Sequence, residues 1–317
     1  MKAAIVESYD HPPRFRDFDK PTPRQGEILV KVKAAALSQL VRIQAAGKHY
    51  IRTPPPFIPG VDGVGELKDG SRVYFAFPRA PVGSMADYVC VDSNNIVQLP
   101  DEIDDVTAAA IANPGMSSWA ALTERVGFKE GESVLINGAT GASGRLAIQI
   151  AKHLGASRVI AAGRNPKHEE DLLALGADQY FLTDTSDSRF LKELQQQFDI
   201  GIDVVLDYLW GSPAETIIKA VAGTTKRATQ PRVRFVNLGS LAGTEISLSA
   251  GALRSTGLEL VGAGLGSLTN AALMRSIKNL MAAVVPEDLR IKATAYPLSS
   301  VESEWNKKTD ERIVFQI

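Results

Sequence analysis

The sequence feature that most constrains the fold is a glycine-rich loop between a short apolar run and an amphipathic one. Ser133–Asn137 centres on Val-Leu-Ile, as is typical of a buried strand, and Gly138–Gly144 reads Gly-Ala-Thr-Gly-Ala-Ser-Gly. Arg145–Leu154 follows with its apolar residues on one helical face. A strand, a glycine loop and a helix in this order present backbone N–H groups and a positive helix end to an anion. The pattern therefore predicts a site for the pyrophosphate of a dinucleotide.

Each position of the loop suits that task. Gly141 lets the backbone approach the pyrophosphate, and Gly144 lets the helix pack close to the strand. Ala139 replaces the first glycine of the usual fingerprint, which leaves A-x-G-x-x-G. The residues expected to contact the cofactor are Thr140, Gly141, Ala142, Ser143 and Gly144. The alternative is a purely structural turn in another α/β protein.

Strands and helices alternate from about residue 114 to residue 267. Further strands are expected at Arg158–Ala162, Gln179–Leu182, Asp203–Asp207, Val233–Asn237 and Leu258–Gly262, and helices at Pro166–Leu175, Ser188–Phe198 and Ser212–Val221. Strict alternation favours a parallel, doubly wound α/β sheet with right-handed crossovers.

The chain before residue 114 is expected to be β-rich. Short strand-like runs at Ile28–Lys33, Ser71–Ala76 and Ala86–Val91 are separated by glycine and proline, as in a small barrel or sandwich. The last residues contain one helix, Asn270–Ala283, and short strands ending in Ile313–Phe315, too little for a domain of their own. We therefore predict one domain from residues 1–113 and 268–317 and a dinucleotide-binding domain from residues 114–267.

The residues after the second strand of the alternating region favour NADP over NAD. An NAD site usually has an acid about 20 residues beyond the glycine loop, but counting about 20 from Gly144 reaches Arg164, and the first acid is Glu169. Gly163 leaves room for a phosphate, Arg164 can bind it bidentately, and Lys167 adds a charge. The predicted 2′-phosphate loop is Gly163, Arg164, Asn165 and Lys167. The alternative is that these are solvated charges beside the acids that follow.

Composition excludes several other classes of function. The chain has 35 basic and 36 acidic residues, so no overall positive charge attracts nucleic acid or a membrane. Its one cysteine, Cys90, excludes an intrachain disulfide and a cysteine-rich metal site. Because we find neither a signal peptide nor a membrane span, we expect a cytoplasmic protein.

Four further motifs carry a resemblance to a known family. They are Pro23–Val32 (Pro-Arg-Gln-Gly-Glu-Ile-Leu-Val-Lys-Val), Pro59–Gly65 (Pro-Gly-Val-Asp-Gly-Val-Gly), Gly83–Tyr88 (Gly-Ser-Met-Ala-Asp-Tyr) and Gly131–Ile136 (Gly-Glu-Ser-Val-Leu-Ile). With the glycine loop, they resemble the zinc-independent branch of the medium-chain dehydrogenases/reductases, which contains quinone oxidoreductases and enoyl reductases. The resemblance covers nearly the whole chain. It implies a Rossmann domain and a β-rich, GroES-like catalytic domain.

The resemblance also implies chemistry without a metal. Zinc-containing members of the family hold a catalytic zinc with Cys, His and Cys. The matching positions here are Leu37 or a neighbour, Val61 and Asn113, none of which is a usual ligand for a catalytic zinc.

Several site residues follow from the resemblance. Ser38 and either His49 or Tyr50 are implied to donate a hydrogen bond or a proton to the substrate oxygen. Residues implied to contact the cofactor near its nicotinamide are Ser117, Leu238, Gly239, Ser240, Gly262 and Gly264. Without the family, each of these small residues would be assigned to a turn or to tight packing.

Together these observations predict an NADPH-dependent oxidoreductase that transfers hydride to a quinone or an α,β-unsaturated carbonyl compound in a cleft between the domains. The alternatives are an NADPH-dependent ketone reductase of the same fold and a non-catalytic NADPH-binding sensor or scaffold. The resemblance implies a homodimer that pairs an edge of the cofactor-domain sheet, with Thr244–Leu248 as the candidate edge or else an exposed loop.

Overall fold

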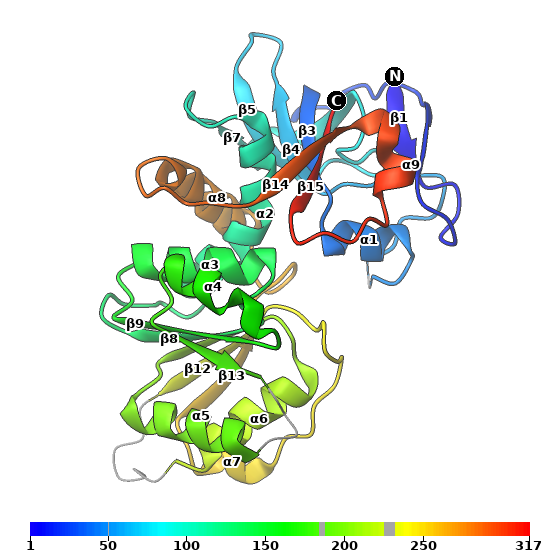
Figure 1. Ribbon diagram of the computed structural model, residues 1–317. Coiled ribbons are helices and arrows are strands. Elements are labelled where there is room, and N and C mark those ends of the chain that lie inside the picture. Colours follow the sequence, from blue (N-terminus) through cyan, green and yellow to red (C-terminus); the bar gives the residue numbers. More distant parts are fainter. Residues whose placement is uncertain (50, 184–187, 225–231) are drawn as a thin grey trace. The chain divides into compact units, whose positions relative to one another are not determined.

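A computed structural model describes residues 1–49, 51–183, 188–224 and 232–317 of the chain (Figure 1). The chain divides into two compact units. The first unit consists of Met1–Asn113 and Leu273–Ile317, and the second of Pro114–Ala272. The sequence analysis drew the second boundary at residues 267 and 268.

A six-stranded parallel sheet forms the centre of the second unit. Its strands are β8 (Ser133–Asn137), β9 (Arg158–Gly163), β10 (Gln179–Leu182), β11 (Val204–Asp207), β12 (Val233–Asn237) and β13 (Leu258–Gly262). Their order is β10-β9-β8-β11-β12-β13, so the chain reverses its direction of growth between β8 and β11. This is the doubly wound dinucleotide-binding arrangement, and the predicted fold class is confirmed.

Helices cover both faces of this sheet (Figure 1). One face carries α3 (Ala142–His153) and α4 (Glu169–Ala174), which follows a 3₁₀ turn, η3 (Pro166–His168). The other face carries α5 (Ser188–Ile200), α6 (Gly211–Ala222) and α7 (Ala250–Arg254), whose apolar side chains form one buried cluster with the strands. Thr244–Leu248 lies outside the strands of the described chain, and the edges of the sheet are β10 and β13. Of the two alternatives for this segment, a sheet edge or a loop, the structure shows the loop.

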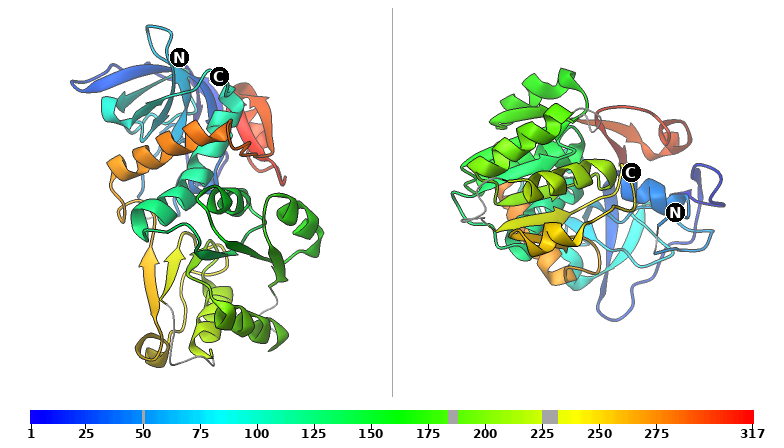
Figure 2. Two further views of the ribbon diagram at one scale, coloured as in Figure 1. Left: turned by 90° about the vertical axis from the view of Figure 1, so that its left-hand side faces the viewer. Right: turned by 90° about the horizontal axis from the view of Figure 1, so that it is seen from below.

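The first unit is built mainly on antiparallel strands. A seven-stranded sheet contains β3 (Glu27–Ala36), β4 (Asp62–Glu66), β5 (Arg72–Ala76), β6 (Tyr88–Asp92), β7 (Ile96–Gln98), β14 (Ala293–Pro297) and β15 (Arg312–Gln316), and β1 (Lys2–Ile5) pairs with β2 (Arg14–Asp17). Strands β14 and β15 form one parallel pair. Strand β15 pairs antiparallel with β3, so the end of the chain completes a sheet that its beginning started. Both chain termini lie on this unit and close together in every view (Figures 1 and 2).

The remaining α-helices are α1 (Gln39–Ala45), α2 (Asp105–Ala120), α8 (Asn270–Val284) and α9 (Val301–Glu304). A π-helical turn at Ala121–Arg125 follows α2. The sequence pattern predicted only β-rich structure up to residue 113, so α1 and α2 were both missed. The longer of the two, α2, was missed for a clear physical reason. Its residues 108–112 are all fully buried. A helix that is apolar on every side shows no amphipathic period, so the pattern gave no signal.

In the described part of the chain, no helix is long and apolar enough to cross a membrane.

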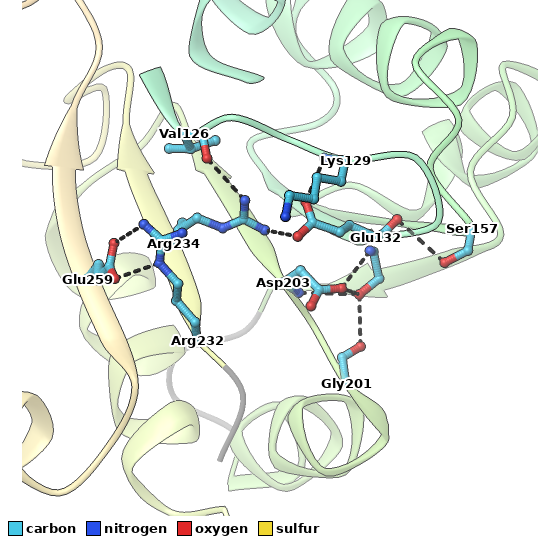
Figure 3. Close-up of polar contacts among 10 residues, drawn as sticks. Val126, Lys129, Glu132, Ser157, Gly201, Asp203, Arg232, Arg234 and Glu259 are labelled. Atoms are coloured by element: carbon cyan, nitrogen blue, oxygen red, sulfur yellow. Dashed lines mark hydrogen bonds and ion pairs between the residues drawn. The ribbon is translucent and has the colours of Figure 1, made fainter. Parts of the chain in front are cut away.

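A network of charged residues joins the amino ends of the strands in the second unit (Figure 3). Arg234 of β12 is only 3% exposed; its Nη1 donates to the carbonyl of Val126 at 3.1 Å, and its Nη2 lies 2.6 Å from Glu132 Oε1. Nearby, Arg232 makes a bidentate pair with Glu259, with N–O distances of 2.6 and 2.8 Å, but both side chains are exposed. The two pairs have similar geometry and very different burial.

We expect Glu132→Ala to lower the free energy of unfolding by about 3–5 kcal/mol, because it leaves the charge of Arg234 buried and unpaired. Glu259→Ala removes an equally close but exposed pair and should cost at most about 1 kcal/mol. Urea unfolding followed by circular dichroism measures both variants. Equal losses of unfolding free energy in Glu132→Ala and Glu259→Ala would contradict the larger contribution that we assign to the buried pair.

Candidate functional site

The predicted cofactor segments meet at the carboxyl edge of the parallel sheet. Strands β8, β9, β11, β12 and β13 end at Asn137, Gly163, Asp207, Asn237 and Gly262, and because the strands are parallel these ends share one edge. The glycine loop, the predicted 2′-phosphate loop (Gly163–Lys167, called the basic loop below) and the segments 238–240 and 262–264 each lie at one of these ends. Ligands of open α/β sheets bind at this edge, beside the point where the strand order reverses.

The glycine loop forms a tight connection into α3. Gly141 is the N-cap, and in the described chain no side chain caps the first turn, which begins at Ala142 and Ser143. A Cβ atom at Gly144 would lie 2.4 Å from the Gly138 carbonyl oxygen and 2.5 Å from Ala139 Cα, so only glycine fits. A Cβ atom at Gly141 would meet nothing closer than 3.9 Å. The loop thus packs tightly on its inner side and is open at Gly141, as a site for a pyrophosphate requires.

The basic loop lies beside the glycine loop. A Cβ atom at Gly163 would come within 2.7 Å of Thr140 Cγ2, so the two loops are in contact. Asn165 Oδ1 accepts a hydrogen bond from the Lys167 N–H at 3.1 Å and starts η3. Arg164 is exposed, and within the described residues neither its guanidinium nor the Lys167 ammonium has a hydrogen bond or an ion pair. The two cations that the sequence assigned to a phosphate are therefore available to one.

A buried carboxylate, which the sequence analysis did not single out, organises the edge of the sheet. Asp207 ends β11 and is fully buried. It accepts hydrogen bonds from Asn137 Nδ2 at 2.7 Å, Asn237 Nδ2 at 3.4 Å, and the backbone N–H groups of Leu209 and Trp210 at 3.1 Å. Burial raises the pKa of Asp207, and these four donors oppose that shift. The signal in the sequence that could have identified Asp207 is an acidic residue at the end of an apolar strand.

Ser117 lies against the same edge. Its hydroxyl donates to the Pro114 carbonyl at 2.7 Å and lies 3.5 Å from the hydroxyl of Tyr208, the residue after β11. Burial raises the pKa of Tyr208 to about 12, so its phenol stays protonated at neutral pH. The sequence analysis had not included Tyr208 among the site residues.

The segments expected near the nicotinamide are held by backbone hydrogen bonds. The N–H groups of Leu238 and Gly239 donate to the Asp207 carbonyl at 2.7 and 3.2 Å, and Ser240 follows on the surface. The Gly262 carbonyl accepts from Arg125 Nε at 2.8 Å, and the Gly264 N–H donates to Ser267 Oγ at 2.7 Å. Their roles toward the cofactor remain predictions.

The predicted catalytic residues lie in the first unit. Ser38 is 4% exposed and is the N-cap of α1, where its Oγ accepts from the Val41 N–H at 3.1 Å. Its hydroxyl proton is still available for donation. His49 Nδ1 accepts from the Ile51 N–H at 3.1 Å, and Tyr50 lies outside the described residues. Their catalytic roles remain predictions.

A second buried acid lies in the first unit. Asp62 is 3% exposed, and its Oδ2 accepts from the Tyr74 hydroxyl at 2.9 Å. Burial raises the pKa of Asp62 to about 6, although the charge of Arg312 acts in the opposite direction. In the described chain, Asp62 Oδ1 and two nitrogens of Arg312 are buried without a hydrogen-bond partner. This is a polar cluster inside a β core.

A family model described as "zinc-binding dehydrogenase" matches residues 142–282. The chain is 28% identical to a "probable NADPH-dependent quinone reductase" of Emericella nidulans, and the match covers 96% of this chain and 96% of the relative. It is 31% identical to 2-methylene-furan-3-one reductase of Solanum lycopersicum, over 68% of this chain and 59% of that enzyme. The structure matches quinone oxidoreductase from Thermus thermophilus with a TM-score of 0.81 and 25% identity over the full length of both chains.

The chain is a medium-chain dehydrogenase/reductase of the quinone oxidoreductase-like type. The family predicted from the sequence motifs is thereby confirmed.

Zinc, which the description of the family model implies, does not fit this dehydrogenase/reductase. At the expected ligand positions, Leu37 is buried in the apolar core, and Val61 and Asn113 are not usual zinc ligands. Cys90 lies buried in β6, and burial raises the pKa of its thiol. Within residues 1–49, 51–183, 188–224 and 232–317, no three His, Cys, Asp or Glu side chains are grouped closely enough to hold a metal ion.

Two glycines of the loop should respond differently to alanine. Gly144→Ala places Cβ against the backbone of Gly138 and Ala139 and should lower the melting temperature. Gly141→Ala fits without a clash, so the melting temperature should stay within about 2 °C while dinucleotide affinity falls by roughly tenfold or more, because the methyl group occupies the open side of the loop. Differential scanning fluorimetry and titration with a dinucleotide separate the two effects. Undiminished affinity of Gly141→Ala would argue against the site.

Asp62 should make stability depend on pH. Because its pKa is about 6 in the fold against 3.8 in a free chain, the native state holds the proton more tightly, and its contribution to stability is lost as pH rises from about 4 to about 6. The free energy of unfolding of the wild type minus that of Asp62→Asn should therefore fall by about 3 kcal/mol over this range. Urea unfolding at pH 4, 5, 6 and 7 measures the difference. A difference that is independent of pH would contradict the raised pKa.

Proposed function

We propose that this protein is an NADPH-dependent oxidoreductase that reduces a quinone or an α,β-unsaturated carbonyl compound without a metal. The observation that carries the proposal is an open glycine loop at Gly141 beside two cations, Arg164 and Lys167, that have no ion pair among the described residues. The names of similar proteins agree with it. The Emericella relative is named an NADPH-dependent quinone reductase, the Thermus enzyme was solved in complex with NADPH, and the tomato relative is named for reduction of a methylene-furanone.

The residues present fit NADP(H). The first-turn N–H groups of α3 would bind the pyrophosphate. Arg164 would bind the 2′-phosphate bidentately, with Lys167 as a second charge and Gly163 leaving room. Ser117 and the segments 238–240 and 262–264 would orient the nicotinamide. When bound, the cofactor supplies the hydride, and the protein holds the cofactor and the substrate in the orientation that the transfer needs.

The substrate oxygen gains negative charge during hydride transfer and needs a hydrogen-bond donor. We assign this role to Ser38, whose cap hydrogen bond uses an oxygen lone pair and leaves its proton free, together with His49 or Tyr50. Loss of one such donor costs about 3 kcal/mol in transition-state stabilisation. The proposed cleft between the domains rests on the family resemblance.

We also propose a cytoplasmic homodimer. The buried Cys90 agrees with a reducing compartment. With Thr244–Leu248 assigned to a loop, the outer side of β13 becomes the candidate edge for pairing with a second copy. Light scattering tests the oligomeric state.

The experiment that tests the function is a screen of NADPH oxidation with quinones, enones and matched saturated ketones, with NADH as the cofactor control. Oxidation with quinones or enones and not with the ketones supports the proposal. Activity on the saturated ketones would instead make the protein a ketone reductase. Tight NADPH binding without oxidation on any acceptor would make it a sensor or scaffold.

Arg164→Ala should lower kcat/KM for NADPH by about 10–100-fold, because a charge-assisted hydrogen bond to a charged group contributes roughly 1.5–3 kcal/mol. kcat/KM for NADH should change less than about twofold. Arg254→Ala, at an exposed arginine of α7 in the same unit, is the matched control and should alter neither value. If Arg164→Ala leaves the preference for NADPH intact, the assignment of the 2′-phosphate loop is wrong.

A further inference from the structure

One side chain that the proposed function does not use connects the two loops of the cofactor site. Arg145 lies in the first turn of α3, and its side chain is only 18% exposed. Its Nε donates to the Thr140 carbonyl at 3.1 Å, and its Nη2 to His168 Nδ1 at 3.1 Å. Both terminal nitrogens lie 3.4 Å from Asp171 Oδ2. One guanidinium thus joins the glycine loop to η3 and to the start of α4.

The contact with His168 fixes the far end of the basic loop. The loop leaves β9 at Gly163, whose carbonyl accepts from the Thr183 N–H at 2.8 Å, and it reaches η3 at Asn165, whose carbonyl accepts from the Tyr180 hydroxyl at 2.9 Å. Arg145 holds the next anchor point, His168. Because an arginine only donates, His168 Nδ1 accepts this hydrogen bond.

Two cationic side chains lie between these anchors, Arg164 and Lys167. In the part of the chain that the structure describes, Arg164 and Lys167 bind nothing through their charged groups, so the anchors at Gly163, Asn165 and His168 determine where the two charges lie. The contact with Thr140 has a second effect. The positive charge of Arg145 lies against the Thr140 carbonyl oxygen, which reduces the repulsion between that oxygen and a nearby phosphate.

We propose that Arg145 is a positioning residue for coenzyme selection: it sets the spacing between the glycine loop and the basic loop so that a dinucleotide with a 2′-phosphate reaches both. This inference rests on the proposed function and adds to it a residue that touches neither reacting atom. A lysine cannot substitute, because one ammonium nitrogen does not span Thr140 and His168 with a planar fork.

Affinities for NADP⁺ and NAD⁺, measured by calorimetry, test the proposal without relying on turnover. Arg145→Met keeps the length of the aliphatic chain and should weaken NADP⁺ binding by at least tenfold and NAD⁺ binding by less than threefold. Arg145→Lys should resemble Arg145→Met. Lys152→Met is the matched control: Lys152 is a cation on the same helix, paired with Asp178 at 2.7 Å, and its loss should leave both affinities unchanged.

A double-mutant cycle separates positioning from a general effect of charge. If Arg145 acts through the basic loop, Arg145→Met added to Arg164→Ala should weaken NADP⁺ binding by less than threefold beyond Arg164→Ala alone. Additive losses would overturn the proposal, and so would equal weakening of NADP⁺ and NAD⁺ by Arg145→Met. Should Arg145→Met fail to fold, His168→Ala removes only the far contact and should give the same selective loss.

The coenzyme preference of the wild type distinguishes a failure of the proposed function from a failure of this inference alone. A wild-type protein that binds NADP⁺ no more tightly than NAD⁺ overturns the proposed function together with this inference. A wild-type preference that persists unchanged in Arg145→Met and His168→Ala overturns this inference alone.

Discussion

The close approach of α3 to β8 is the constraint on which the rest of the cofactor unit depends. At Gly144 there is no room for a Cβ atom above the backbone of Gly138 and Ala139. Because the helix begins so close to the strand, its first N–H groups lie at the carboxyl edge of the sheet, where the field of the helix end favours an anion. On its other side the loop is open, since a Cβ atom at Gly141 would meet nothing closer than 3.9 Å.

The edge of the sheet needs its own internal support. Strand ends leave backbone and side-chain groups without ladder partners, and Asp207 binds several of them at once across β8, β11 and β12. A buried carboxylate is costly unless several donors surround it, and here they come from three strands or their following turns. The amino edge is held differently, by the buried pair of Arg234 and Glu132. Charge pairing thus fixes one end of the sheet, and the other end remains free to bind a ligand.

Sequence reasoning succeeded where one local signal determined one local structure. The strand at Ser133–Asn137, the helix after the glycine loop and the alternation that follows were all predicted, because periodicity and glycine spacing report backbone geometry directly. It failed at α2, whose buried residues have no polar face to set a period. It left Thr244–Leu248 open between a sheet edge and a loop, because β-propensity describes how residues suit a strand and not whether a partner strand is present.

The sequence by itself determined the fold class, the family, the glycine loop and the absence of a cysteine-based zinc site, since each depends on residue type and spacing along the chain. Only the tertiary structure decided which residues meet. Thr140 and His168 are far apart in sequence and share the guanidinium of Arg145, and Ser38, chosen as a catalytic hydroxyl, is also the cap of α1. Such contacts join side chains across loops and elements, and no pattern along a single chain records them, because only the packed fold sets their distances.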